Sequence, residues 1–255
     1  MFLAIDIGNT SINIGLFDGS VIRQSWRIST RYSEMADEYA VLFISLMEAS
    51  GYDISKVQIC AVCSGVPKVR TSIVDMLRRY FKLDPLVVTS GVKTGMKILT
   101  DNPKEVGADR IVNAVAAKNK YNKAAIIVDL GTAITLDIID SKGDYLGGVI
   151  APGIELAAQS LHDKAAALPS VELSAPPKVI GKNTVDAMKS GIVYGYADLV
   201  NGLVGRAKAE LGEDAIVVAT GGYAEMIAPH ANSIMEVEPT LTLYGLQLIY
   251  YMNRI

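Results

Sequence analysis

The sequence predicts an α/β protein made of two similar domains that arose by internal duplication. Strand and helix patterns alternate along 255 residues, a length that suits two modest domains. Half of the residues are apolar, which is enough for sizeable buried cores. An apolar strand that ends in Asp, followed by Gly and Thr, occurs at Asp6 and again at Asp129, about half a chain later. We therefore expect one domain over 1–120 and a second over 121–255.

The first half of the chain predicts a strand hairpin followed by alternating helices and strands. Asp18-Gly19 is a tight-turn signal between two strands, and Gly51 is a typical residue for ending a helix. Pro67 suits the first position of a helix. In chain order we expect strands over 2–7, 11–17 and 21–28, a helix over 33–49, a strand over 57–63, a helix from residue 67 and a strand over 86–88.

The second half repeats this pattern from about residue 108. Apolar residues at helical spacing, such as Ile192, Tyr196, Leu199 and Leu203, predict one long helix there. In chain order we expect a helix over 108–121, strands over 124–130, 133–139 and 144–150, helices over 155–166 and 185–211, a strand over 216–219 and a last helix over 241–253.

Composition argues against several classes of partner. Lys and Arg total 24 against 27 for Asp and Glu, which provides no basic surface for nucleic acid or an anionic membrane. The chain shows no bilayer-spanning apolar run and no secretory leader, so we expect a cytoplasmic protein. Cys60 and Cys63 lie in a predicted strand and point to opposite faces. We expect core residues there rather than a zinc or redox pair.

The most informative motif is the acidic turn at the end of the two related strands. Asp6 precedes Gly8 and Asp129 precedes Gly131, and a Thr follows soon after each glycine. Glycine lets the backbone approach a phosphate, while N–H groups and a Thr hydroxyl can donate to phosphate oxygens. The carboxylate can hold Mg²⁺. Two copies predict nucleotide-phosphate binding, and the alternative is that both turns merely open hairpins on a duplicated scaffold.

Two other positions are candidates for nucleotide chemistry. The chain lacks the P-loop, the G-x-G-x-x-G motif and the protein-kinase motifs. Gly221 and Gly222 follow a predicted strand, where their backbone could lie against adenine and ribose, or where they simply form a strand-to-helix turn. Asp109 begins a predicted helix beside Arg110. Its carboxylate could orient and deprotonate an acceptor hydroxyl, or could only pair with the neighbouring Arg.

Four short motifs in a fixed order make the chain resemble the type III pantothenate kinases. They are Asp-Ile-Gly-Asn-Thr at 6–10, Gly-Ala-Asp-Arg at 107–110, Asp-Leu-Gly-Thr at 129–132 and Gly-Lys-Asn-Thr at 181–184. The similarity covers essentially the whole chain. It implies two similar actin-like (ribonuclease H-like) domains with ATP bound in the cleft between them. It also implies the first step of coenzyme A biosynthesis, in which ATP phosphorylates pantothenate to 4′-phosphopantothenate.

The same resemblance implies roles for individual residues. Asp109 would be the general base, Asp6 would hold Mg²⁺ and Asp129 would hold a monovalent cation, K⁺ or NH₄⁺. The pantothenate pocket would include Gly107, Ala108, Asp109, Arg110, Thr184 and Thr100, the last in place of a Tyr that many relatives carry. The ATP site would include Asp6, Ile7, Gly8, Asn9, Thr10, Ser11, Ile12, Asn13, Thr132, Gly221 and Gly222. The family works as a homodimer with the acceptor pocket near the subunit interface.

Two other hypotheses keep the fold and change the function. One replaces pantothenate by a sugar or acetate, or makes the protein an ATPase. The other is a non-catalytic regulator on the same scaffold, for which broken catalytic positions would be expected. The chain retains Asp6, Asp109, Arg110 and Asp129, so the kinase is the favoured interpretation.

Overall fold

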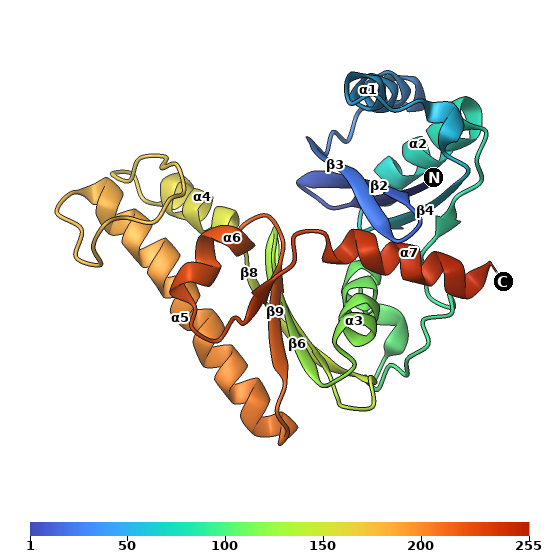
Figure 1. Ribbon diagram of the computed structural model, residues 1–255. Coiled ribbons are helices and arrows are strands. Elements are labelled where there is room, and N and C mark those ends of the chain that lie inside the picture. Colours follow the sequence, from blue (N-terminus) through green and yellow to red (C-terminus); the bar gives the residue numbers. More distant parts are fainter. Residues whose placement is uncertain (255) are drawn as a thin grey trace. The chain divides into compact units, whose positions relative to one another are not determined.

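The computed structural model describes residues 1–254, which form two compact units (Figure 1). The first unit contains residues 1–95, residues 102–116 and the chain from residue 240 onward, and the second contains residues 96–101 and 117–239. The described strands form two five-stranded sheets, and helices pack on both. The predicted α/β class with two similar domains is confirmed.

The two sheets have the same strand order. The first runs β3-β2-β1-β4-β5, with bounds β1 (Phe2–Ile7), β2 (Ser11–Asp18), β3 (Val21–Ser29), β4 (Ile59–Ser64) and β5 (Leu86–Val87). The second runs β8-β7-β6-β9-β10, with bounds β6 (Ala125–Leu130), β7 (Ala133–Ile139), β8 (Tyr145–Pro152), β9 (Ile216–Thr220) and β10 (Glu236–Val237). The central strand of each sheet, β1 or β6, is antiparallel to the strand that follows it in the chain, β2 or β7. It is parallel to its other neighbour, β4 or β9. The acidic turn follows that central strand in both.

Alternation along β1 places Asp6 on a particular face of the first sheet. Leu3 and Ile7 lie in a core formed with α1 (Ala36–Ala49) and α2 (Pro67–Met76). Residues two apart share a face, so Phe2 and Asp6 lie on the opposite side. There the Phe2 ring packs against Tyr250 of α7 (Leu241–Asn253), with ring centroids 5.3 Å apart. The side of the sheet that carries Asp6 is therefore the side that α7 covers.

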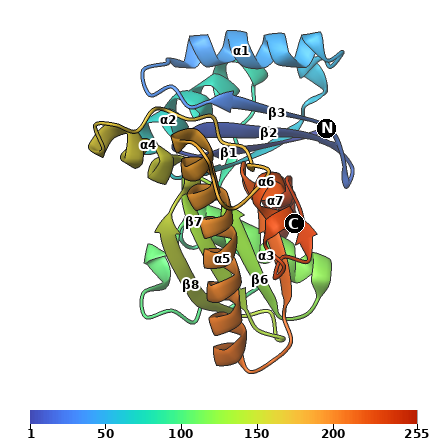
Figure 2. The same ribbon diagram turned by 90° about the vertical axis from the view of Figure 1, so that its left-hand side faces the viewer.

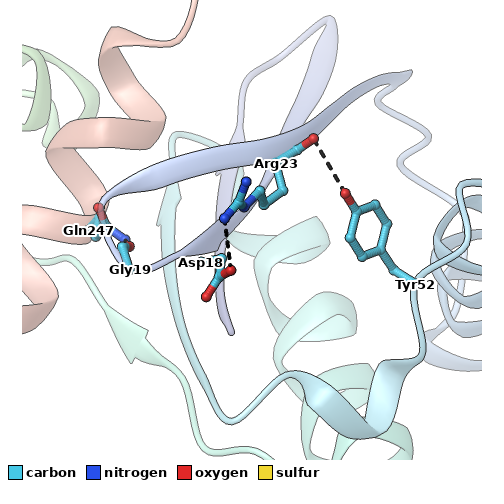
Figure 3. A network of polar contacts seen from close by, with 5 residues as sticks. All are labelled: Asp18, Gly19, Arg23, Tyr52 and Gln247. Atoms are coloured by element: carbon cyan, nitrogen blue, oxygen red, sulfur yellow. Dashed lines mark hydrogen bonds and ion pairs between the residues drawn. The ribbon is translucent and has the colours of Figure 1, made fainter.

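One polar contact holds α7 against the β2–β3 hairpin, and two others hold Arg23 of that hairpin (Figure 3). Gln247 is buried, and its amide donates to the carbonyl oxygen of Gly19 at 2.8 Å. Gly19 has a φ of +59°, the left-handed conformation that a tight turn needs. Arg23 and Asp18 form an exposed ion pair at 3.1 Å, and the Tyr52 hydroxyl donates to the Arg23 carbonyl at 3.5 Å.

The C-terminal helix also packs closely on the start of α3 (Ala108–Tyr121). The Thr242 hydroxyl donates to the buried Asn113 side chain at 2.7 Å, and a Cβ at Gly245 would overlap the Val112 carbonyl. Because of these contacts α7 belongs to the first unit, whereas the predicted domain over 121–255 includes it. The predicted boundary between residues 120 and 121 lies close to the division between the two units at residues 116 and 117, within α3. The limits of the two domains stay a prediction.

In the second unit, α5 (Thr184–Leu211) runs along the sheet (Figure 2). Val128 of β6 and Val200 of α5 belong to one buried core. Alternation places Asp129 on the face of the sheet opposite to Val128. The helices α4 (Ile154–Lys164) and α6 (Ala224–Ile227) complete this unit.

Most predicted elements are confirmed, and the differences have local causes. The helix predicted over 33–49 begins at Ala36, because Met35 is its N-cap and donates its backbone N–H to the Glu38 carboxylate at 2.7 Å. The short α6 and β10 were not predicted, since four and two residues are too few to show a period. Among residues 1–254, no helix has the length and apolarity needed to cross a membrane.

Candidate functional site

Asp6 lies at the end of β1, half-buried and directly opposite Asn13 of β2. The Asn13 amide donates to the Asp6 carboxylate at 3.2 Å. Burial raises the pKa of Asp6 from 3.8 to about 7, against the lowering effect of the Asn13 hydrogen bond, and the negative charge of Asp109 adds to the rise. The first acidic turn thus presents a poorly solvated carboxylate, which a cation would stabilise.

The structure brings Asp109 to the same region as Asp6. Asp109 is exposed in the first turn of α3, and its carboxylate folds back over Gly107. A Cβ at Gly107 would lie only 2.5 Å from Oδ1 of Asp109. Burial raises the pKa of the Cys63 thiol, and Asp6 and Asp109 both add to this rise. Cys63 pairs with Asp6 across β4 and β1. The two carboxylates lie beside a neutral thiol. Together they can attract a cation, and one of them can accept a proton.

The side chains of Cys63 and Cys60 are enclosed in the protein. Both are buried free cysteines in β4, as predicted. Burial raises the pKa of Cys60 to about 12, so its thiol stays protonated near neutral pH. A protonated, buried thiol is a poor nucleophile and a poor metal ligand.

The turn after β1 is tight and open to solvent. The Gly8 N–H donates to the Ser11 carbonyl at 3.0 Å, and a Cβ at Gly8 would lie 3.1 Å from that oxygen. Asn9 and Thr10, at the tip of the turn, are exposed. A ligand can therefore reach the backbone of this turn.

The second acidic turn has related geometry and is lined by two glycines. The Gly131 N–H donates to the Ala133 carbonyl at 3.2 Å, which makes this turn one residue shorter than the first. Gly221 has a φ of +92°, and a Cβ there would lie 2.5 Å from Oδ1 of Asp129. A Cβ at Gly153 would overlap the Thr132 carbonyl. Only glycine permits so close an approach of these segments to the turn.

The remaining predicted residues lie outside these two clusters. Thr184 is exposed at the first position of α5, after Asn183, whose side chain caps the helix by accepting from the Asp186 N–H at 2.9 Å. Thr100 lies in the second unit. Its Cγ2 is 3.9 Å from the position that a Cβ would take at Gly147. Its Oγ1 is buried and has no hydrogen-bond partner among the described residues.

No group of three or more His, Cys, Asp and Glu residues that could bind a metal occurs within residues 1–254. A Mg²⁺ ion at Asp6 would therefore complete its coordination with phosphate oxygens and water, which is the usual arrangement for this ion in phosphoryl-transfer sites. The poorly solvated carboxylate of Asp6 fits one such ligand.

The second unit also contains an apolar hollow of about 680 Å³ between α4 and α5. Its lining includes Leu156, Leu161, Met188 and Ile192, with polar groups only from Ser160 and Tyr196. A hollow without charged side chains lacks the groups that phosphoryl transfer requires.

Sequence reasoning missed three residues that shape the two turns. Gly153 lies between β8 and α4, and its packing against Thr132 could not be inferred from its neighbours in the sequence. Thr30 and Tyr32 donate hydrogen bonds to the backbone of the first turn. No sequence signal marks these two, because they follow β3 and meet the turn only through the pairing of β2 with β3.

Comparison with known proteins agrees with the resemblance. A sequence model of the type III pantothenate kinases matches residues 2–206. The type III pantothenate kinase of Dehalococcoides mccartyi strain CBDB1 is 49% identical over 253 residues, which cover 99% of this chain and 96% of that protein. The type III pantothenate kinase of Syntrophotalea carbinolica is 47% identical over 254 residues and covers 100% of both chains.

Among solved structures, the polyphosphate/ATP-glucomannokinase of Arthrobacter sp. strain KM superposes with a TM-score of 0.53 at 12% identity, covering 98% of each chain. At this identity the likeness shows the fold alone. The actin-like class implied by the resemblance is confirmed by it.

Proposed function

Because the chain belongs to the type III pantothenate kinase family, it is a phosphotransferase, and we propose that Asp109 is its general base and that the turn at 6–13 binds Mg–ATP. The family phosphorylates pantothenate in the first step of coenzyme A biosynthesis. The observation that supports the proposal most directly is the proximity of Asp109 to Asp6, since a solvent-exposed carboxylate then lies beside the expected phosphate site.

In the proposed reaction, the pantothenate hydroxyl attacks the γ-phosphorus of ATP. A new oxygen–phosphorus bond forms, the bond between the γ-phosphorus and the bridging oxygen breaks, and ADP leaves with the electron pair. Asp109 accepts the hydroxyl proton late in the step, because phosphoryl transfer depends mainly on positioning and charge stabilisation. Mg²⁺, when bound, would neutralise charge on the phosphate oxygens.

We propose the binding roles that the resemblance to the family implies for individual residues. Asp6 would hold Mg²⁺, and N–H groups at the exposed tip of the turn over 6–13 would donate to phosphate oxygens, since the Gly8 N–H already donates to the Ser11 carbonyl. Arg110 would bind the pantothenate carboxylate with its two-pronged guanidinium. The other proposed pantothenate contacts are Gly107, Ala108, Thr184 and Thr100, and the other proposed nucleotide contacts are Thr132, Gly221 and Gly222.

The decisive test of the proposed function is ADP release measured with ATP, Mg²⁺ and pantothenate, in potassium and again in sodium alone. We expect turnover that requires pantothenate and falls at least tenfold without potassium, because we assign the monovalent cation to Asp129. The Asp129→Asn variant should show nearly the same turnover in potassium as in sodium. Turnover that is equal in both salts would contradict the cation assignment, and turnover without pantothenate would indicate an ATPase.

We expect the protein to be a homodimer that covers the apolar surface around α4 and α5. Ile150 of β8, Leu156 of α4 and Ile180, which precedes α5, are 66%, 53% and 83% exposed, and exposed apolar side chains of this size are typical of an interface. Leu156→Lys should shift the mass measured by sedimentation equilibrium toward one chain. Lys substitution of Val41, which is 69% exposed on α1, is the matched control. A monomeric wild-type protein would contradict the proposal.

A further inference from the structure

Three consecutive carbonyl oxygens of the first acidic turn accept hydrogen bonds from one short segment. The Thr30 hydroxyl donates to the Gly8 carbonyl at 2.7 Å, and the Thr30 N–H donates to the Thr10 carbonyl at 2.9 Å. The Tyr32 hydroxyl donates to the Asn9 carbonyl at 3.1 Å and is 3.3 Å from the Asn9 side-chain oxygen. Thr30 and Tyr32 together are called the carbonyl clamp below.

The clamp determines the direction of the peptide groups in the turn. In a trans peptide the C=O and the following N–H point in opposite directions. Because the carbonyls of residues 8–10 point toward the clamp, the N–H groups of Asn9, Thr10 and Ser11 point away from it. Successive N–H groups that point to one side form a concavity that binds anions.

We propose that Thr30 and Tyr32 are positioning residues that orient the turn for the phosphates of the nucleotide. This inference rests on the proposed binding of ATP by residues 6–13 and adds to it the residues that preorganise that backbone. The clamp contacts the turn rather than the substrate, so it acts on nucleotide affinity and not on proton transfer.

Hydrogen bonds, rather than apolar packing, set the orientation of the turn. Gly8 has no side chain, and Asn9 and Thr10 are exposed, so the tip of the turn contributes nothing to the core of the unit. The ring of Tyr32 is 49% exposed, so its hydroxyl is the part of the residue that acts on the turn. Loss of the clamp would leave the backbone of the turn free to rotate, and binding would then have to order it.

The clamp is itself anchored to the core of the first unit. The hydroxyl of Tyr39, a buried residue of α1, donates to the Arg31 carbonyl at 2.9 Å, between the two clamp residues. The Ser72 hydroxyl of α2 donates to the Glu34 carbonyl at 3.2 Å. The segment is thus tied to two helices, which gives it the rigidity needed to orient a solvent-exposed turn.

The test compares Thr30→Val, Tyr32→Phe and the double variant with wild type. Each lost hydrogen bond should raise the KM for ATP and the Kd for a non-hydrolysable ATP analogue about three- to tenfold. The kcat and the KM for pantothenate should stay within about twofold, and Thr30→Ser should restore wild-type values. Tyr52→Phe, which removes a hydroxyl that contacts the Arg23 carbonyl (Figure 3), is the matched control.

Hydrogen exchange of the Asn9, Thr10 and Ser11 amides, with and without the Mg²⁺-bound ATP analogue, separates this inference from the proposed function. Wild-type protein without protection there would contradict the phosphate site itself. Protection in wild type combined with unchanged nucleotide affinity in the double variant would overturn the role of the clamp. If Thr30→Val lowers thermal stability, Tyr32→Phe decides alone, because its half-exposed ring is not needed for the core.

Discussion

Replacing Asp109 by Asn is expected to lower kcat by about a thousandfold while the Kd for Mg–ATP stays within about threefold of wild type. A positioned general base typically contributes 10²- to 10⁴-fold, and Asn cannot accept the hydroxyl proton. ATP affinity should persist because Asp109 lies on α3, whereas the phosphates are assigned to the turn after β1. Steady-state kinetics and calorimetric titration of a non-hydrolysable ATP analogue measure the two quantities separately.

The matched control for this variant is Asp75→Asn. Asp75 is an exposed carboxylate on α2 in the same unit, so the control removes one charge without touching the acidic cluster. It should keep wild-type kinetics. An Asp109→Asn variant with more than a tenth of the wild-type kcat would show that another group, or water, accepts the proton.

Replacing Asp6 by Asn is expected to abolish measurable turnover and, without nucleotide, to make the protein more stable at pH 8. The pKa of Asp6 is raised from 3.8 to about 7 in the folded protein, mainly by burial. A raised carboxyl pKa means that wild type loses stability as pH rises from about 4 to about 7, because ionisation then costs more when folded than when unfolded. Below pH 4 the Asp6 carboxyl is neutral in both states and this cost disappears.

The size of the gain follows from the shift. One pKa unit corresponds to about 1.4 kcal/mol, and partial solvent access reduces the sum, so we expect the Asp6→Asn substitution to add about 2 to 4 kcal/mol at pH 8. The amide oxygen introduced by the substitution can still accept the hydrogen bond from Asn13. Denaturant unfolding at pH 4 and pH 8 measures the difference, with the exposed Asp75→Asn as control. Equal stability of wild type and the Asp6 variant at pH 8 would contradict the desolvation of Asp6.

Bound Mg–ATP should make the wild-type protein more stable than the Asp6→Asn variant. A bound cation removes the cost of the ionised carboxylate, and ligand binding to the folded state adds stability by mass action. Wild type should therefore gain thermal stability on addition of Mg²⁺ and an ATP analogue, while the Asp6 variant gains much less. An equal gain would show that Asp6 does not take part in binding Mg–ATP.

The strands, the helices and their repeat could be predicted from local patterns along the chain. The apolar runs before Asp6 and Asp129 predicted β1 and β6, since strand patterning and the turn residues that end it are local properties. The hairpin that follows each turn was predicted for the same reason, and two hairpins half a chain apart indicated the repeated sheet. The order of the short motifs then identified the family, because a combination of motifs is far more specific than any one of them.

Which of those residues meet could be learned only from the folded chain. It brought Asp109 beside Asp6, placed Gly221 against the carboxylate of Asp129 and packed α7 with the first sheet. It also joined Thr30 and Tyr32 to the phosphate turn. Local periodicity states which face of an element is apolar but not which distant element covers that face. Contacts between residues far apart in the chain follow from strand order and helix packing, and these appear only when the whole chain has folded.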